Sequence, residues 1–457
     1  MLNNLKFSTD FFKRKEIAFA IFFLTAFFSI GFLHPDEHYQ ILELVNLKLS
    51  DRFVDMSIFN WDFHERMRSW FQPFIYFLFF APFDFLSGFE LATMARFFNG
   101  LLGIMALSLF IKVIDQENHK KIFILAAFTW FIPFLLVRTS SESLSTSLFL
   151  IGYYLYHKEK KTLSGLLMGF SFLARYQMGV AIAPFYLYEL YKKRVSVKDF
   201  SFIVMALLST FALGVIIDYW GYKEWTYSPF NYLYHNLVLG RASDFGTDPF
   251  YYYLTKPLLK GIPPLSLVVA FFGIKNLLRE RHRTMALALL SFLVVHSMIS
   301  HKEVRFLTFV YIVLSVFSYS YILKSGRYKK LLSASIIISS LVMLKTSFSP
   351  AHSRINFYQE MSKHKATEVY LLKESGKFEF TMPFYMEDTI ITRFVDSPMP
   401  KDYLLMGTNY QSFKLISKRD NCKQVYSQYP EWIESVNFFD WLKRSSFMTL
   451  YRCENIN

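Results

Sequence analysis

Long apolar runs separated by short basic connectors constrain this chain more than any other feature of its sequence. The first run, from Glu16 to Leu33, is long enough for about one bilayer crossing. Further runs, several of them shorter than an ideal span, lie at about 91–111, 121–137, 143–156, 162–174, 176–190, 200–218, 257–278, 284–299, 304–323 and 331–347. If each crosses once, the pattern predicts an all-α, multi-pass membrane protein with about 11 to 12 transmembrane helices.

The composition excludes an ordinary soluble protein. Hydrophobic residues make up 53% of the chain and charged residues 19%, and Phe alone occupies 53 positions. That is more apolar mass than a water-exposed surface can hide. The net charge of +14 would suggest nucleic acid in a soluble chain. Here the cations stand between apolar runs, so we interpret them as topology signals and expect no nucleic-acid partner.

The positions of these cations predict the orientation of the chain. Lys13, Arg14 and Lys15 precede the first run, which places the N-terminus in the cytoplasm. The later basic connectors then face the same side, and the connectors with acidic or mixed charge face the other. We therefore expect an integral membrane protein whose C-terminal segment lies outside the cytoplasm. A cleaved signal peptide is the alternative for the first run, but no small-residue cleavage site follows it.

The run from Phe71 to Leu86 does not fit this count, because a crossing there would reverse every later connector. Pro73 and Pro82 interrupt helix hydrogen bonding. We therefore expect a re-entrant or interfacial element. Residues 1–349 then form one transmembrane domain, with external loops at 34–70 and 219–256 and an external turn at 300–304.

Residues 350–457 change to a mixed polar and aromatic composition with short β-like runs, which predicts a small extracytoplasmic α/β domain. This segment carries the two cysteines of the chain, Cys422 and Cys453. The sequence does not decide between a disulfide in an oxidising compartment and two buried, unpaired thiols.

Asp36 and Glu37 are the first candidates for chemistry. They follow His34-Pro35 where the first run leaves the membrane, and Pro35 biases His34 away from helix, so the chain should turn there. A carboxylate with reduced solvation has a raised proton affinity, which suits a general base. A solvated helix end explains the same residues without function. A divalent cation is a further alternative, but two adjacent carboxylates without other ligands do not define a metal site.

Two further clusters on the predicted external side combine cations with aromatic rings. Trp61, Asp62 and Arg68 belong to the first, where guanidinium groups can bind phosphate and Trp rings can lie at headgroup level. An amphipathic surface anchor would use the same residues. The second is the charged turn His301-Lys302-Glu303-Val304-Arg305. Lys302 and Arg305 share a face if a helix has begun, and together can hold a phosphate; a loop of mutually paired charges is the alternative.

The segment between these clusters is rich in aromatic residues with scattered Asn and Asp. Asp248 and Tyr251 lie in Gly-Thr-Asp-Pro-Phe-Tyr-Tyr-Tyr-Leu, a composition typical of a sugar-binding rim, although an aromatic membrane belt has the same composition. Arg175 stands between two short apolar runs, where it either binds a lipid phosphate or extends to the interface.

These motifs, in this order, resemble glycosyltransferase family 22, which includes the GPI-anchor and N-glycan precursor mannosyltransferases. The matching elements are His-Pro-Asp-Glu after the first run, Trp-Asp-Phe with a following Arg-Ser-Trp and Pro73, Gly-Thr-Asp-Pro-Phe-Tyr-Tyr-Tyr-Leu, and His-Lys-Glu-x-Arg-Phe. The resemblance covers about residues 30 to 325. It implies a GT-C fold and an inverting transfer of a sugar, typically mannose, from a polyprenyl-phosphate donor to a hydroxyl of a glycan or glycolipid acceptor.

The resemblance also implies roles for residues. Asp36 would take the acceptor proton, with Glu37 positioning it or the acceptor. His301, Lys302 and Arg305 would stabilise the departing phosphate, and we add Arg68 and Arg175 to this phosphate-binding set. We assign the acceptor or sugar side to four residues: Trp61, Asp62, Asp248 and Tyr251.

The chain departs from its eukaryotic relatives in the tail, where Met382-Pro383-Phe384-Tyr385 stands in place of a Pro-Cys-His-type sequence, so the acceptor stays open. The Phe-, Lys- and Ile-rich style favours a bacterial inner-membrane protein that uses polyprenyl phosphate in place of dolichol. A GT-C transferase of another sugar to lipid A or protein is the nearest alternative. A lipid or glycan transporter is another, although it predicts repeats and midplane charges that the sequence does not show.

Overall fold

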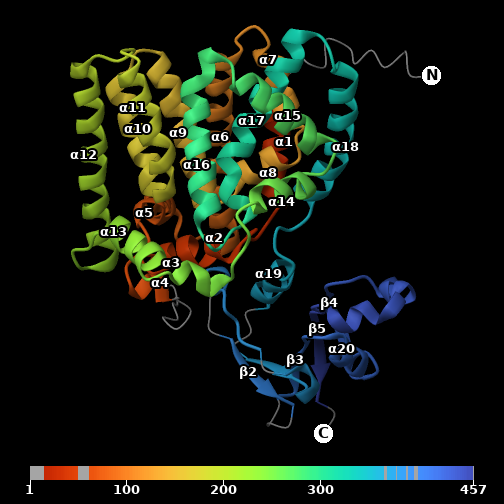
Figure 1. The fold of residues 1–457 in the computed structure, drawn as a ribbon. Helices are drawn as coiled ribbons and strands as arrows, with labels where there is room; N and C mark the ends of the chain where they lie inside the picture. Colours follow the sequence, from red (N-terminus) through yellow and green to blue (C-terminus); the bar gives the residue numbers. More distant parts are fainter. Residues whose placement is uncertain are drawn as a thin grey trace.

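The computed structural model describes residues 15–49, 61–364, 368–376, 378–386, 390–395 and 400–455. A bundle of helices forms the larger part, and a smaller C-terminal unit lies beside one end of it (Figure 1). The helices of the bundle are α1 (Lys15–Phe28), α6 (Gly88–Ile114), α7 (His119–Ala127), α8 (Phe131–Val137), α9 (Ser141–His157), α10 (Lys161–Ala174), α11 (Gly179–Tyr191), α12 (Val197–Tyr222), α15 (Leu265–Leu277), α16 (Arg283–Met298), α17 (Thr308–Ser325) and α18 (Lys329–Phe348).

Serine caps start three of these helices. The side chains of Ser87, Ser140 and Ser196 each accept a hydrogen bond from the backbone N–H three residues further on, which satisfies a donor that the first turn leaves free. These caps set where α6, α9 and α12 begin. On α12, large apolar side chains such as Met205 and Leu208 remain exposed, as expected for a helix that faces lipid.

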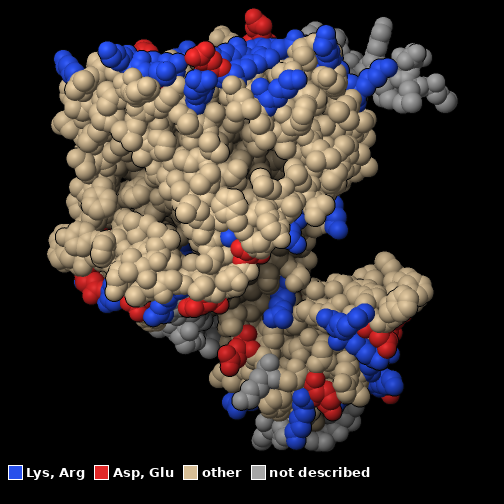
Figure 2. Space-filling view, viewed as in Figure 1, with Lys and Arg blue, Asp and Glu red and all other residues tan. Residues whose placement is uncertain are grey.

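Among the described residues, four helical segments are long and apolar enough to cross a bilayer by themselves. They are Gly88–Ile114, Val197–Tyr222, Val304–Ser325 and Lys329–Phe348. The pair α7 and α8, bent by 80°, is a fifth if the two helices count as one span. Other helices are shorter than an ideal span, so the eleven crossings stay a prediction. Lys and Arg gather at the end of the bundle opposite the C-terminal unit (Figure 2).

The segment from Phe71 to Leu86 forms only a short helix, α5 (Phe71–Phe80), followed by one 3₁₀ turn, η5 (Ala81–Phe83). The backbone N–H of Trp70, just before α5, donates to Asp218 near the end of α12 at 2.7 Å. Gly88, just after the segment, lies against Phe384 of the C-terminal unit. The chain therefore enters and leaves this segment at the same end of the bundle.

That end of the bundle is built from short elements. Before α5 the chain forms α2 (Pro35–Glu37), the π-turn η3 (His38–Leu42), α3 (Glu43–Asn46) and α4 (Trp61–His64). Between α12 and α15 it forms α13 (Ser228–Leu233), η7 (Tyr234–Val238), η8 (Arg241–Phe245) and α14 (Tyr252–Lys260), and η10 (Val304–Leu307) leads into α17. These elements lie on the side of the bundle that faces the C-terminal unit (Figure 1).

The C-terminal unit is a five-stranded mixed sheet with two helices, α19 (Ile355–Lys363) and α20 (Tyr410–Ile416). The strand order is β2-β1-β3-β5-β4, with β1 parallel to β2 and β3, and β5 antiparallel to β3 and β4. The strands are β1 (Glu368–Leu371), β2 (Ile391–Phe394), β3 (Asp402–Gly407), β4 (Cys422–Ser427) and β5 (Thr449–Glu454). Cys422 and Cys453 face each other in register and form a disulfide, which decides the alternative left open by the sequence.

A segment of this unit returns to the bundle. Phe384 and Tyr385, in the 3₁₀ turn η12 (Pro383–Tyr385), are buried in one apolar cluster with Phe80, Leu91 and Ala95. We call residues 378–386 the tail segment. Its contact with α6 requires a residue without a side chain, because a Cβ on Gly88 would lie 1.7 Å from the carbonyl oxygen of Phe384.

We expect Gly88→Ala to separate the tail segment from α6. The clash is with backbone and cannot be relieved by a rotamer change, so the free energy of unfolding should fall by about 1–3 kcal/mol or more. Denaturation of the purified protein measures this. Gly100→Ala is the matched control in the same helix, because its Cβ would meet only a methyl group of Val137 at 3.3 Å. Equal stability of the two variants would contradict the predicted contact.

Candidate active site

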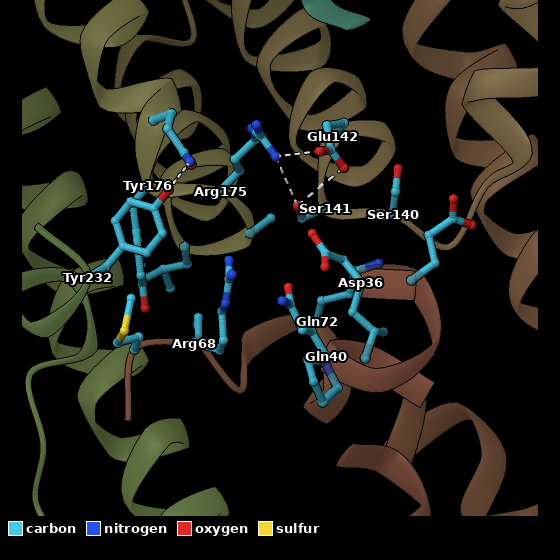
Figure 3. Close-up of a pocket in the computed structure, with 18 of the residues that line it drawn as sticks. Asp36, Gln40, Arg68, Gln72, Ser140, Ser141, Glu142, Arg175, Tyr176 and Tyr232 are labelled. Atoms are coloured by element: carbon cyan, nitrogen blue, oxygen red, sulfur yellow. Dashed lines mark hydrogen bonds and ion pairs between the residues drawn. The ribbon is translucent and has the colours of Figure 1, made fainter. Parts of the chain in front are cut away.

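A polar cavity of about 60 Å³ opens where α2, α9 and α10 meet at the end of the bundle that faces the C-terminal unit. The charged side chains that line it are Asp36, Glu37, Arg68, Glu142, Arg175 and Arg305. The remaining polar lining comes from Gln40, Ser69, Gln72, Ser140, Ser141, Tyr176, Gln177 and Tyr232. Most of these side chains point into a common space in Figure 3. We call this cavity the polar pocket.

Local structure around Pro35 places the carboxylates of Asp36 and Glu37 at the pocket with different exposure. His34 has extended backbone geometry, and its Nδ1 accepts a hydrogen bond from the N–H of Asp36, so α2 starts directly at Pro35. The Asp36 carboxylate remains partly accessible, whereas Glu37 is only 1% exposed. Glu37 Oε1 accepts a hydrogen bond from the N–H of Leu33, and burial raises the pKa of Glu37. Asp36 is therefore the carboxylate available for substrate.

Arg305 is the centre of the charged network. Its guanidinium contacts Asp36 at 2.6 Å, Glu303 at 2.7 Å and Glu142 at 2.9 Å. Arg175 also pairs with Glu142, at 2.6 Å (Figure 3). Four separate stretches of the chain meet through these pairs.

The network controls the proton affinity of Asp36. Burial alone would raise the pKa of Asp36, but the hydrogen bond with His34 and the Arg305 and Arg68 guanidinium groups outweigh it. Together they hold the pKa of Asp36 well below its usual range, so the raised proton affinity expected from the sequence is wrong for Asp36 in this structure, because neighbouring cations outweigh burial. The pKa of Glu303 is lowered too, because its hydrogen bond and charge interaction with Arg305 outweigh burial.

Arg68 is a further cation in the pocket lining, and like Arg305 it acts on Asp36. Its Nε contacts Asp62 at 2.9 Å, and its guanidinium lies 5.7 Å from the ring centre of Tyr232. Burial would lower the pKa of Arg68, but Asp62 and then Asp36 raise it, so this guanidinium is charged. The side chain of Gln40 donates to the same oxygen of Asp62 at 2.9 Å.

Arg175 retains hydrogen-bonding capacity. Its Nη1 binds Glu142, but Nε and Nη2 have no hydrogen-bond partner within the described parts of the chain. Gln72 similarly donates to Tyr76 and to the Thr139 carbonyl, while its Oε1 has no partner there. Buried polar atoms are usually paired, so these atoms are suited to bind a substrate in the pocket.

An apolar groove adjoins the polar pocket. It has a volume of about 510 Å³ and runs between α8, α14, α15 and α17, with Phe134, Leu258, Ala270 and Val310 among its lining residues. His34, Glu303 and Arg305 line its polar end. Arg305 therefore borders both spaces, which makes it the junction between a charged site and a long hydrophobic channel.

The structure brings together five of the residues singled out from the sequence, since Asp36, Glu37, Arg68, Arg175 and Arg305 all line the polar pocket. Asp62 lies directly behind Arg68. His301 contacts Glu303 at 3.1 Å, and Glu303 in turn contacts Arg305.

The other predicted residues lie outside the pocket. The ammonium group of Lys302 donates to the carbonyls of Asp248, Ile299 and Ser300, so in this structure it joins two loops. Asp248 contributes its backbone carbonyl, not its side chain, to this contact with Lys302. Tyr251 does not line the pocket and is 60% exposed. The side chain of Trp61 lies outside the described residues. Among the described residues, no group of three or more His, Cys, Asp or Glu side chains could hold a metal ion.

Glu142 was not assigned to the site from the sequence, and Met382-Pro383-Phe384-Tyr385 was named there without a prediction of where the tail segment lies. Glu142 is a single carboxylate at the start of an apolar run, and that placement is itself a signal of function or pairing near a membrane. The tail segment reaches the site through Glu43, whose carboxylate accepts the N–H of Phe384 at 3.0 Å and lies 2.7 Å from Nε2 of His38. Tyr385 stacks on the His38 ring, so the segment supports the turn that carries Asp36.

Comparison with known proteins gives consistent results. The model of the Alg9-like mannosyltransferase family matches residues 16–386. The human GPI alpha-1,2-mannosyltransferase 3 is 24% identical over 289 residues, 60% of this chain and 50% of that protein. A Drosophila melanogaster Dol-P-Man:Man(7)GlcNAc(2)-PP-Dol alpha-1,6-mannosyltransferase is 28% identical over 171 residues, 37% and 24% of the two chains. The chain spans about half the length of the GPI mannosyltransferases that it matches.

A solved structure shares the fold. The crystal structure of ArnT from Cupriavidus metallidurans bound to undecaprenyl phosphate superposes with a TM-score of 0.55 and 11% identity, covering 97% of both chains. At this identity the likeness concerns the fold alone, which is the GT-C fold expected from the sequence motifs.

Removing the central guanidinium should destabilise the protein strongly. In Arg305→Gln, three carboxylates lose their shared cation, and a buried charge without a partner costs about 3–5 kcal/mol of stability. Denaturation of the purified protein in detergent measures the loss. Arg66→Gln is the control, because Arg66 pairs with Glu224 at an exposed site and should contribute less than about 1 kcal/mol. Similar small losses in both variants would show that Arg305 does not hold the site together.

Proposed function

This chain belongs to the Alg9-like mannosyltransferase family, and on that premise we propose that it is an inverting glycosyltransferase. It moves a sugar, with mannose as the leading candidate, from a polyprenyl-phosphate donor to a hydroxyl group of a glycan or glycolipid acceptor. The reaction takes place on the extracytoplasmic face of the membrane. The observation that carries this proposal is the contact of Arg305 with Asp36 at the junction of the polar pocket and the apolar groove.

The two adjoining spaces match the two parts of such a donor. A polyprenyl chain is wholly apolar, and burial of its methylene and methyl groups in the groove is favourable by about 25 cal/mol per Å². Its phosphate would then lie at the polar end of the groove, beside Arg305. Guanidinium groups bind phosphate oxygens with two parallel hydrogen bonds, which suits Arg305, with the free Nε and Nη2 of Arg175 beyond it.

The chemistry needs one base and one activated leaving group. The acceptor hydroxyl attacks the anomeric carbon of the donor, and its proton passes to the Asp36 carboxylate. The bond between that carbon and the phosphate oxygen breaks, and the electron pair leaves with the polyprenyl phosphate. A single displacement inverts the anomeric configuration, whereas retention by double displacement requires a nucleophilic carboxylate as well. The Glu37 carboxylate is buried and accepts the N–H of Leu33, so Asp36 is the more accessible of the two carboxylates, which supports the single-base scheme.

Other predicted residues receive supporting roles. Arg68 and Arg175 bind the phosphate or the sugar hydroxyls from opposite sides of the pocket. His301 acts through Glu303, and Lys302 holds the external loop at Asp248 against the turn that carries Arg305. Asp62 orients Arg68 toward the pocket, while Trp61 and Tyr251 contact acceptor or membrane lipid.

Orientation follows from two features. The disulfide between Cys422 and Cys453 is suited to an oxidising compartment. The basic end of the bundle, opposite the pocket, is suited to the cytoplasmic side. Both support an active site outside the cytoplasm. The bacterial inner membrane, with a polyprenyl phosphate as lipid carrier, is proposed on the Phe-, Lys- and Ile-rich style of the sequence alone.

The decisive experiment is transfer of radiolabelled mannose from polyprenyl-phosphate mannose by the reconstituted protein. Asp36→Asn keeps the size of the side chain and removes the base, so kcat should fall by about 10² to 10⁴. The matched control is Asp244→Asn, an exposed aspartate in η8 on the same face, which should leave kcat unchanged.

Three results would reject parts of the proposal. Full activity of Asp36→Asn would remove Asp36 as the base. Transfer only from a nucleotide sugar would exclude the lipid-phosphate donor. Activity with another polyprenyl-phosphate sugar but not with polyprenyl-phosphate mannose would retain the glycosyltransferase class and reject mannose as the sugar. It would favour a transferase that acts on lipid A or protein.

The groove makes a separate prediction about the donor lipid. Ala270→Trp places an indole inside the groove, so the KM for a donor of eleven isoprene units should rise about tenfold. A donor of two isoprene units fills much less of the groove and should be affected much less. Leu267→Trp, on the exposed face of α15, is the control. An equal effect on both donor lengths would show that the chain does not lie in this groove.

A further inference from the structure

A second polar cavity lies at the opposite end of the bundle from the active site. It has a volume of about 200 Å³ and is lined by residues of α9, α10, α11, η9 (Glu280–His282) and α16. Helix α9 starts beside the polar pocket at Ser141 and ends at this cavity with His157. At about 1.5 Å per residue the two cavities are separated by roughly 24 Å, so this one belongs to no part of the site described above.

Nitrogen-bearing side chains from four stretches of chain converge on this cavity. Lys161 comes from the start of α10, Arg194 from the turn after α11, and Arg281 and His282 from η9. His157 completes the set from the end of α9. The walls between them include the rings of Tyr153 and Tyr156.

The two carboxylates of the lining are already accounted for. Glu189 is buried, and its oxygens accept hydrogen bonds from Tyr156 at 2.8 Å, from Arg194 at 3.2 Å and from Thr284. Glu159 is 81% exposed and contacts Lys161 from the solvent side. Neither carboxylate neutralises Arg281, whose Nε is bound to the uncharged nitrogen of His282 at 2.9 Å.

The start of two long helices adds to the positive potential. Both α10 and α16 begin at the cavity wall, where Lys161, Thr284 and Met285 line it. Their N-cap residues, Lys160 and His282, make no side-chain capping hydrogen bond, unlike the serines that cap α6, α9 and α12. Uncapped N–H groups and the helix dipole both favour an anion near a helix N-terminus.

We propose that this cavity binds one phosphate group, contributed either by the headgroup of an anionic phospholipid or by a soluble phosphate. Its volume is more than ten times that needed for one water, which leaves room for a phosphate and part of what it is attached to. Its place among the Lys and Arg residues at this end of the bundle is the level at which headgroup phosphates lie (Figure 2). A phosphate bound in the cavity would contact α9, α10 and α16 at the ends of these helices that are remote from Glu142 and Arg175.

The test uses the full-length wild-type protein and the single variant Arg281→Ala, in two arms. One arm measures binding of radiolabelled orthophosphate by equilibrium dialysis in detergent. The other measures retention of phosphatidylglycerol against phosphatidylcholine by native mass spectrometry after extraction from nanodiscs. We expect saturable binding in one arm and a loss of about tenfold in affinity in Arg281→Ala, corresponding to about one charge-assisted hydrogen-bonded contact.

Arg283→Ala is the matched control, because Arg283 is an exposed arginine two residues away that does not line the cavity. Binding confined to orthophosphate assigns a soluble ligand, and binding confined to phosphatidylglycerol assigns a lipid. No binding in either arm, or an equal loss in Arg283→Ala, overturns the proposal. Because Arg281 is surface-exposed and remote from Asp36, sugar transfer should be unchanged in Arg281→Ala, so failure of this inference leaves the proposed function untouched.

Discussion

The cost of a charged group at the edge of a bilayer determines how this end of the molecule is organised. Arg305 can stay there only because carboxylates from distant parts of the chain come to meet it, and the same holds for Glu142 between Arg175 and Arg305. Asp36 follows the first helix, Glu142 starts α9, and Glu303 precedes α17. The pairing therefore fixes the relative positions of three helices, and the polar pocket is the space that they enclose.

The C-terminal unit is tied to the same turn by a second buried contact. Glu43 and His38 are both fully buried, and the tail segment completes their environment with the N–H of Phe384 and the ring of Tyr385. The hydroxyl of Tyr39 also donates to Thr381 at 3.0 Å. η3 follows Asp36 and Glu37 without a break, so the tail segment packs against the element next to the proposed base. The C-terminal unit is thereby linked to the turn that carries Asp36, although it contributes no residue to the pocket lining.

Part of this site could be predicted from the sequence, and the reason differs from residue to residue. Asp36 and Arg305 were recognisable because charged residues bordering apolar runs are rare and stand in distinctive motifs. Glu142 carries the same signal at the start of an apolar run, but only the fold shows that its partners are Arg175 and Arg305. Lys302 and Tyr251 were predicted but lie outside the pocket. Their spacing in the sequence could not show whether each side chain faces the pocket, a loop carbonyl or the surface. The sheet order and the tail contact depend on pairings far apart in sequence, which local patterns do not encode.

Under the proposed function, the charge balance of the pocket favours binding of the donor before the acceptor. Each of the three guanidinium groups of the pocket already has a carboxylate partner: Arg68 pairs with Asp62, Arg175 with Glu142, and Arg305 with Asp36, Glu142 and Glu303. A donor phosphate that pairs with Arg305 would displace one of its three carboxylates. Asp36 is the most accessible of these. The loss of its guanidinium partner, together with the negative charge of the phosphate nearby, would raise the proton affinity of Asp36. Donor binding would thus make Asp36 a stronger base at the step that requires one, whereas an acceptor that bound first would meet a carboxylate still paired with Arg305.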